Sequence, residues 1–239
     1  MPGLRWPDMR NRSTINPHRD HIFYTGMAAA STLLVFAGFS RTYYLKHYFR
    51  TPVLPVLAHV HGLVFTIWTL LFLSQVVLVA ARRTEVHRRL GIVGGLLAVV
   101  VVLLGTGMTV ASVRAGQTAG RPFMGILLVN ALVDLGLFIG FLAAGLYYRY
   151  NKEVHKRLML LAMLSVIIPA YARLPVSRMT IGWLIMASPL PAIAYDAAFL
   201  RRIYATNVIG AALIIGTTPL RFTIAATGWW QQFFEWVTR

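Results

Sequence analysis

The chain has 239 residues, of which 57% are hydrophobic and only 13% are charged. Its mean hydropathy of +0.64 lies outside the range of soluble globular domains, so the composition excludes an ordinary soluble fold. The chain has no cysteine, which excludes disulfides, thiolate metal sites and covalent attachment of haem through C-x-x-C-H. The composition therefore predicts an integral membrane protein.

Seven apolar stretches, each about 20 residues long, follow one another along the chain and match the length needed to cross a bilayer. The fifth stretch is the most interrupted, because it contains Pro169 and ends just before Pro175. We expect an all-α, polytopic transmembrane bundle of about seven helices that forms one integral membrane domain over residues 1–239. The predicted spans are residues 22–42, 55–81, 91–113, 123–149, 157–174, 180–200 and 204–225.

Both ends of the chain differ from the apolar bundle predicted over residues 22–225. Residues 1–21 carry four arginines and two aspartates and lack a signal-peptide cleavage site, so we expect a polar tail before an uncleaved first span. Residues 226–239 are typical of an amphipathic tail at the membrane interface, which can also dock a partner subunit. The aromatic residues of this tail are Trp229, Trp230, Phe233, Phe234 and Trp236.

The 23 basic residues indicate how the chain is oriented, because cytoplasmic loops retain Lys and Arg. About 14 of them fall in alternate segments, namely the N-terminal tail and residues 82–89, 149–157 and 201–202, whereas the opposite loops hold about seven. This pattern predicts a cytoplasmic N-terminus. Charges divided in this way suit lipid headgroups rather than nucleic acid.

A charged hexapeptide occurs twice, each time between two long apolar runs. It reads E-V-H-R-R-L at residues 85–90 and E-V-H-K-R-L at residues 153–158, which predicts an internal duplication of a helical hairpin. His87 and His155 fall in the first turn of a span, where a helix N-terminus disfavours the imidazolium and leaves a neutral ring able to bind iron. The alternative is an interfacial collar in which Lys and Arg reach phosphates.

The second span begins with two more histidines, His59 and His61. Residues two apart on a helix point in nearly opposite directions, so we expect only one of the two to face the bundle. His61, Trp68, Gln75 and Arg82 recur every seven residues and form a polar and aromatic stripe that should face inward. His61 is therefore the better candidate for a ligand, the alternative being a hydrogen bond to a neighbouring helix.

The fourth span carries Asn130 and Asp134, four residues apart on one face. A carboxylate at that depth is costly, so we expect Asp134 to face the bundle with a partner, for which His61, Arg114 and Arg173 are candidates. Asp196 lies nearer a helix end, and we expect its partner in the adjoining loop, which contains Arg201 and Arg202.

Two G-x-x-x-G pairs, Gly91 with Gly95 and Gly136 with Gly140, predict close helix packing. Pro189 and Pro191 predict a kink in the sixth span. These features indicate packing and carry no chemistry of their own.

H-R-R-L-G at residues 87–91, H-K-R-L-M at residues 155–159 and H-V-H-G at residues 59–62 with the following W-x-x-L-F resemble a group of uncharacterised bacterial inner-membrane proteins. That group is distantly similar to the four-helix membrane cytochromes of the b561 type. The resemblance covers roughly residues 35–175 and implies b-type haem held by histidines on facing helices. It implies that His87 and His155 bind a cofactor at an inner site, which His18 or His21 can join. It also implies an outer site formed by His61 with His59 or with the loop residue His47.

Two classes of function therefore stay open. The first is a membrane redox protein that binds haem b or a metal and transfers electrons through interfacial histidines. The second is a non-enzymatic accessory or assembly subunit of a respiratory or photosynthetic complex, without a cofactor of its own. A transporter is a third reading, suggested by the proline-broken spans. Hydrolytic and nucleotide-dependent chemistry has no support, because G-x-S-x-G, H-E-x-x-H and P-loop motifs are absent.

Overall fold

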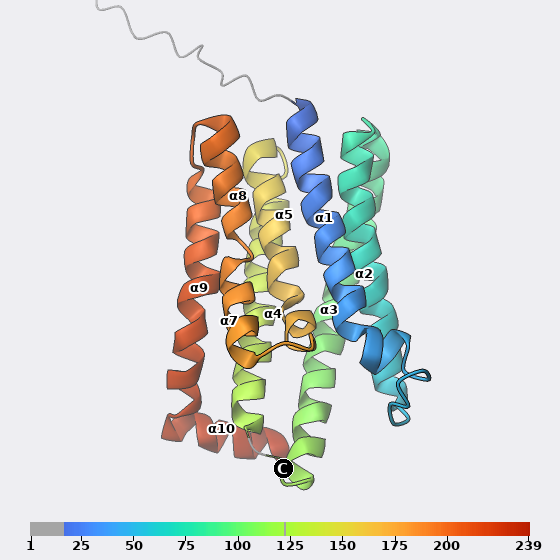
Figure 1. The fold of residues 1–239 in the computed structure, drawn as a ribbon, viewed down its shortest axis with the longest axis vertical. Helices are drawn as coiled ribbons and strands as arrows, with labels where there is room; N and C mark the ends of the chain where they lie inside the picture. The colour runs from blue at the N-terminus through green and yellow to red at the C-terminus, as the bar shows by residue number, and fades with distance from the viewer. Residues whose placement is uncertain (1–16, 122) are drawn as a thin grey trace, which may run out of the picture.

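The computed structural model describes residues 17–121 and 123–239, and these residues form one elongated bundle of helices (Figure 1). Two short π-helical segments, η1 and η2, extend α1 and α8. In chain order the elements are α1 (Pro17–Phe39), η1 (Ser40–Tyr44), α2 (Val56–Ala80), α3 (Thr84–Thr118), α4 (Met124–Tyr147), α5 (Lys152–Val166), α6 (Ile168–Tyr171), α7 (Arg178–Ala187), α8 (Leu190–Tyr195), η2 (Asp196–Leu200), α9 (Ala205–Ala225) and α10 (Gly228–Thr238).

Six helical segments are long and apolar enough to cross a membrane, and they match six of the seven predicted spans. The protein is thus an all-α polytopic bundle that contacts the lipid bilayer. The six segments are Pro17–Tyr44, Val56–Ala80, Thr84–Thr118, Met124–Tyr147, Arg178–Leu200 and Ala205–Ala225.

The remaining predicted span, residues 157–174, has a different form. Its place is taken by α5, which has only 15 residues, and by the single turn α6. The side chain of Asn151 caps the start of α5 by accepting a hydrogen bond from the Val154 amide, 3.3 Å away. The helix stops at Ile167, because Pro169 has no amide hydrogen with which to continue the hydrogen-bond ladder.

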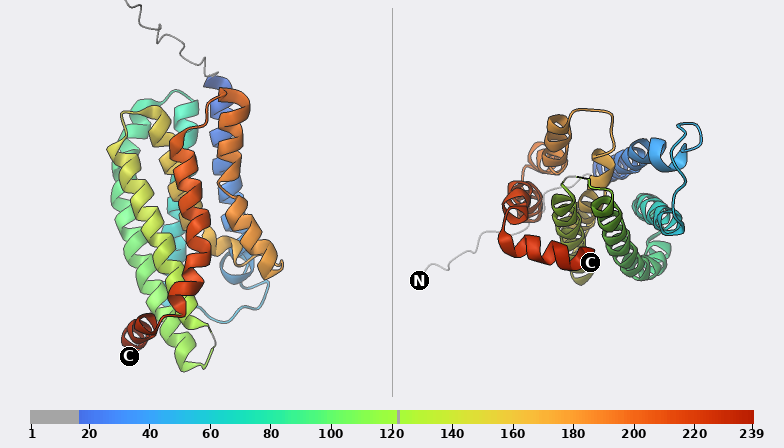
Figure 2. Two further views of the ribbon diagram at one scale, coloured as in Figure 1. Left: turned by 90° about the vertical axis from the view of Figure 1, so that its left-hand side faces the viewer. Right: turned by 90° about the horizontal axis from the view of Figure 1, so that it is seen from below.

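The connections alternate between the two ends of the bundle (Figures 1 and 2). The start of α1 lies at one end together with residues 81–83, 148–151 and 201–204, and we call this the hinge end. The loops at residues 45–55 and 119–121 lie at the opposite end, where α10 crosses the bundle (Figure 2). All the described segments that carry the basic residues of the predicted cytoplasmic side therefore meet at the hinge end.

The short helix α5 forms the centre of the core. Five consecutive residues, Leu160–Leu164, are at most 3% exposed, and α5 packs against α1, α4, α6 and α9. The methyl groups of Leu161 come so close to Gly210 on α9 that a Cβ there would overlap them. By contrast, Leu96 and Leu103 on α3 are more than two-thirds exposed, as expected for a helix face turned towards lipid.

The expectation of close helix packing at the two G-x-x-x-G pairs is wrong for contacts within the chain. A Cβ atom added to any of the four G-x-x-x-G glycines would meet no atom of the described residues within 4 Å, so these glycines make no close helix contact inside the chain. Close approach occurs instead at Gly38, where α1 touches the backbone of Ala170 on α6. The four glycines in question are Gly91, Gly95, Gly136 and Gly140.

The predicted terminal segments are placed only in part. Of the polar tail expected over residues 1–21, residues 1–16 lie outside the described residues, and residues 17–21 already belong to α1. The aromatic tail forms the helix α10, in which Trp230 is buried and donates from Nε1 to the Gly125 carbonyl at 3.2 Å. Trp229 and Trp236 on the same helix remain exposed.

Candidate functional site

A cavity of about 360 Å³ lies between α1, α2, α3, α4 and α6, in the half of the bundle away from the hinge end. Its position follows from the short α5, since no helix continues along the bundle axis beyond Val166. Ile167 and Pro169 line the cavity where the chain turns away. The volume falls within the range of small-molecule binding sites.

The walls of the cavity are mainly apolar, with a few polar groups among them. His61 lines it beside Phe65, whose ring centroid lies 4.2 Å from that of the imidazole. His59 points elsewhere and its Nε2 lies 3.1 Å from Nζ of Lys46, as the helical spacing predicted. The remaining polar residues of the lining are Thr42, Tyr43, Tyr44, Thr69, Thr109, Ser112, Asp134 and Arg173.

Asp134 also belongs to a buried ion pair, but with a partner different from those expected. Its Oδ1 lies 2.7 Å from Nη2 of Arg221 on α9, and both side chains are less than a tenth exposed. The proposed pairing with His61, Arg114 or Arg173 is therefore wrong. Arg114 instead donates from Nε to the Val237 carbonyl of α10, at 2.8 Å.

The other inward-facing polar residues predicted from sequence lie in separate places. Trp68 is buried and packs edge-on against Phe138, with ring centroids 5.2 Å apart. Both amide atoms of Gln75 are buried and have no hydrogen-bond partner among the described residues. Asn130 is half-buried on α4 and does not line the cavity, and Arg82 lies beyond the end of α2 and is exposed.

The two hinge histidines come together at the hinge end. The rings of His87 on α3 and His155 on α5 are nearly perpendicular, with centroids 6.3 Å apart. The Nδ1 atom of His155 lies 2.7 Å from the Gly145 carbonyl on α4. When this nitrogen carries the proton, it donates to the carbonyl and leaves the Nε2 lone pair free, which is the tautomer that a metal-binding imidazole needs.

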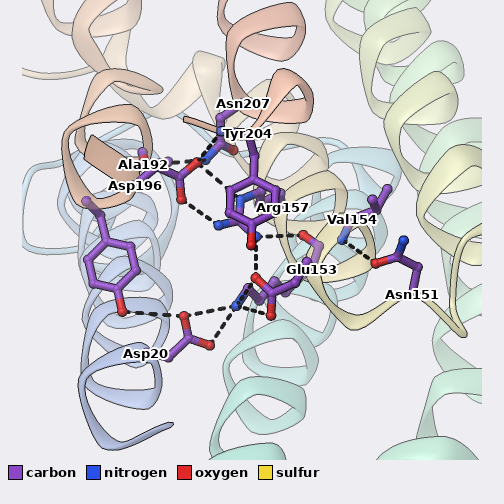
Figure 3. A network of polar contacts seen from close by, with 11 residues as sticks. Asp20, Asn151, Glu153, Val154, Arg157, Ala192, Asp196, Tyr204 and Asn207 are labelled. Carbon is purple, nitrogen blue, oxygen red and sulfur yellow. Dashed lines mark hydrogen bonds and ion pairs between the residues drawn. The ribbon is translucent and has the colours of Figure 1, made fainter. Parts of the chain in front are cut away.

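A second polar cluster at the hinge end surrounds Arg157, whose side chain is fully buried (Figure 3). Arg157 donates through Nε and Nη2 to the two carboxylate oxygens of Asp196, and its guanidinium lies 3.6 Å from the ring centroid of Tyr204. Asp196 is also fully buried and accepts from the Tyr204 amide and from Nδ2 of Asn207. Each oxygen of this carboxylate thus has a partner, which offsets part of the desolvation cost.

The same cluster extends to the start of α1. Nζ of Lys156 lies 2.8 Å from a carboxylate oxygen of Asp20 and 2.8 Å from one of Glu153, while Glu153 also pairs with Arg157 at 2.7 Å. Burial, and after it the nearby Glu153 carboxylate, raises the pKa of the Tyr204 hydroxyl above its usual range, so this phenol stays protonated. The hinge-end cluster thereby ties α1, α5, η2 and α9 together.

The sequence interpretation missed this cluster. Asp196 was expected to pair with Arg201 or Arg202, whereas its partner is Arg157, 39 residues earlier. The expectation was wrong because Asp196 faces the bundle core and not the adjoining loop. A usable signal was present, since the second hexapeptide carries Glu153, Lys156 and Arg157 within two helical turns, more charge than a buried helix normally tolerates without partners.

Among the described residues, no group of three or more His, Asp or Glu side chains is arranged to hold a metal ion. Comparisons with protein families, curated proteins and solved structures found no match to this chain. The cavity, the histidine pair and the hinge-end cluster are therefore interpreted from their geometry alone.

Proposed function

We propose that this membrane protein binds a small, mainly apolar molecule in the cavity between α1, α2, α3, α4 and α6. The observation that carries the proposal is a space of about 360 Å³ with apolar walls and an imidazole, that of His61, on its lining. An apolar pocket with a few convergent polar groups is the usual form of a small-molecule site. Bilayers supply apolar molecules at high local concentration.

The distribution of basic residues supports an orientation for this site. The hinge end carries most of the described Lys and Arg residues, so we propose that it faces the cytoplasm and that the cavity lies towards the outer side of a bacterial inner membrane. The hinge-end cluster around Arg157 would then lie on the cytoplasmic side. A ligand would then enter from the outer half or from the adjoining lipid.

Co-purification tests this proposal even though the ligand is unidentified. Ala131 lines the cavity on α4, whereas Ala111 on α3 is exposed, so Ala131→Phe fills the cavity and Ala111→Phe makes the same change outside it. The wild type and Ala111→Phe should retain a small molecule that mass spectrometry of the extracted protein detects and that Ala131→Phe loses. Equal amounts in all three proteins, or no bound molecule in any, would overturn the proposal.

The histidine pair favours a second candidate function, electron transfer through haem b. His87 on α3 and His155 on α5 have ring centroids 6.3 Å apart and would be the two residues that hold the group. When bound there, haem would supply a redox-active iron, for which imidazole is a usual protein ligand. The Gly145 carbonyl would hold the His155 ring in position.

A reduced-minus-oxidised absorption spectrum of the purified protein tests this second candidate. A b-type band that is lost in His155→Ala and kept in the exposed-loop variant His47→Ala would support it. A spectrum without such a band in protein purified from haem-sufficient cells would contradict it, while leaving the cavity proposal intact.

A further inference from the structure

One cation on the cavity lining, Arg173, has no carboxylate partner among the described residues. Arg173 follows α6 and is exposed at the surface of the chain. Its Nη1 donates to the Pro169 carbonyl at 2.8 Å, and its guanidinium lies 4.4 Å from the ring centroid of Phe39. These contacts fix the position of the side chain but leave its charge uncompensated.

The other charged groups at the cavity neutralise each other. Asp134 reaches the lining but is paired with Arg221 at 2.7 Å. The lining therefore has a net positive charge, and Arg173 is its source. His61 lies on the same lining, so the cavity also offers an imidazole as a hydrogen-bond donor or acceptor.

The rest of the lining has hydroxyl groups but no further charged side chain, so it offers no second site for an anionic group. Most of the exposed wall is hydrocarbon from helices α1 to α5. The residues that form it include Val35, Leu54, Phe65, Met108, Leu135 and Val166. A molecule that fits these walls has an apolar body, and its polar end lies where Arg173 and His61 are found.

We infer that the ligand of this cavity is a single-chain amphiphile with an anionic head, held with the head at Arg173 and the apolar chain between α2, α3 and α4. The planar guanidinium forms paired hydrogen bonds with carboxylates and phosphates alike. The head can thus be the carboxylate of a free fatty acid or the phosphate of a one-chain phospholipid. This inference rests on the proposed function, because it names the ligand class of the same cavity.

Photolabelling in nanodiscs of zwitterionic phosphatidylcholine tests the inference. The probes are a diazirine-labelled fatty acid and the matching fatty alcohol, which has the same chain without the charge. Arg173→Gln should reduce labelling by the acid by about tenfold, the effect of losing one charge-assisted hydrogen-bonding group, and should leave labelling by the alcohol unchanged. Arg178→Gln removes a nearby exposed cation outside the cavity and should change neither.

The outcomes test the anionic head group and the cavity proposal separately. If Ala131→Phe blocks both probes while Arg173→Gln labels like the wild type, the anionic head is wrong and the cavity proposal stands. If Ala131→Phe blocks neither probe, the proposed function fails and the inference fails with it. Arg173→Lys keeps the charge and should label with the acid more strongly than Arg173→Gln; equal labelling of the two folded variants would overturn the inference. Competition by unlabelled fatty acid or by lysophosphatidic acid then identifies the preferred head.

Discussion

The two E-V-H hexapeptides are nearly identical in sequence and opposite in environment. In the first copy, Glu85, Arg88 and Arg89 are all exposed at the start of α3. In the second, at the start of α5, Arg157 is fully buried and Glu153 and Lys156 take part in the hinge-end cluster. Only the first copy has the exposed charges that the interfacial-collar alternative requires.

The neighbours of each helix explain this difference. α3 packs against α2, α4 and α10 and turns a face to lipid, whereas α5 packs against α1, α4, α6 and α9. Carboxylates from η2 and α1 receive Arg157 and Lys156, and neither element is among the main packing partners of α3. The neighbouring helices thus decide whether the charged residues of a hinge are exposed or buried. Four pairs of variants test this comparison.

The largest expected effect comes from the two equivalent arginines. Arg157→Met leaves the buried Asp196 carboxylate without its cation and should lower the free energy of unfolding by about 3–5 kcal/mol. Arg89→Met changes an exposed side chain and should stay within about 0.5 kcal/mol of the wild type. Denaturation in mixed micelles measures both, and equal losses would show that the two copies do not differ as described.

A double variant sharpens the same point. Asp196→Asn combined with Arg157→Met removes both buried charges and should be more stable than Arg157→Met alone by about 1–3 kcal/mol. In the first copy, the double variant Glu85→Gln with Arg89→Met should change the free energy of unfolding by the sum of the two single changes. A double-mutant cycle measures both couplings; zero coupling at Arg157 would mean that the buried pair does not act as a unit.

The residues that precede α5 and α3 should differ by a smaller amount in their contribution to the free energy of unfolding. Asn151 caps α5 through its side chain, so Asn151→Ala should cost about 1 kcal/mol. Arg83 occupies the same position before α3 and makes no capping hydrogen bond with its side chain, so Arg83→Ala should cost little. Thermal unfolding of the two variants checks this, and a larger loss in Arg83→Ala would contradict it.

The smallest expected difference concerns the two glutamates. Glu153 accepts from Lys156 and Arg157 but is 28% exposed, so solvent screens the pairs and Glu153→Gln should cost roughly 0.5–1 kcal/mol. Glu85→Gln should cost less, because Glu85 is exposed. Raising the salt concentration should narrow the gap between the two variants. A gap that widens with salt would argue against an electrostatic origin.

The sequence was sufficient to predict the features that depend on a single helix, namely its length and the direction in which its residues face. The apolar runs predicted six of the membrane-length helices, and the helical period placed His61 and Trp68 inward. A duplicated hairpin remains a prediction, although His87 and His155 occupy the same position in their helices and lie close together.

The rest depended on which helices become neighbours, and sequence spacing does not reveal that. Asp134 pairs with Arg221, and Asp196 pairs with Arg157; both partners lie on distant helices. The cavity is likewise a consequence of where α5 ends. Pro169 signalled an interruption of that helix, but the space it leaves exists only because α1, α2, α3 and α4 continue past it.

A cryo-electron microscopy map of the protein in lipid nanodiscs would show whether the cavity is a ligand site. We expect elongated density between α2, α3 and α4 that ends beside Arg173 and His61, and that is absent in Ala131→Phe. A wild-type map at side-chain resolution in which side chains of the protein fill this space, or in which it holds no elongated density, would contradict it.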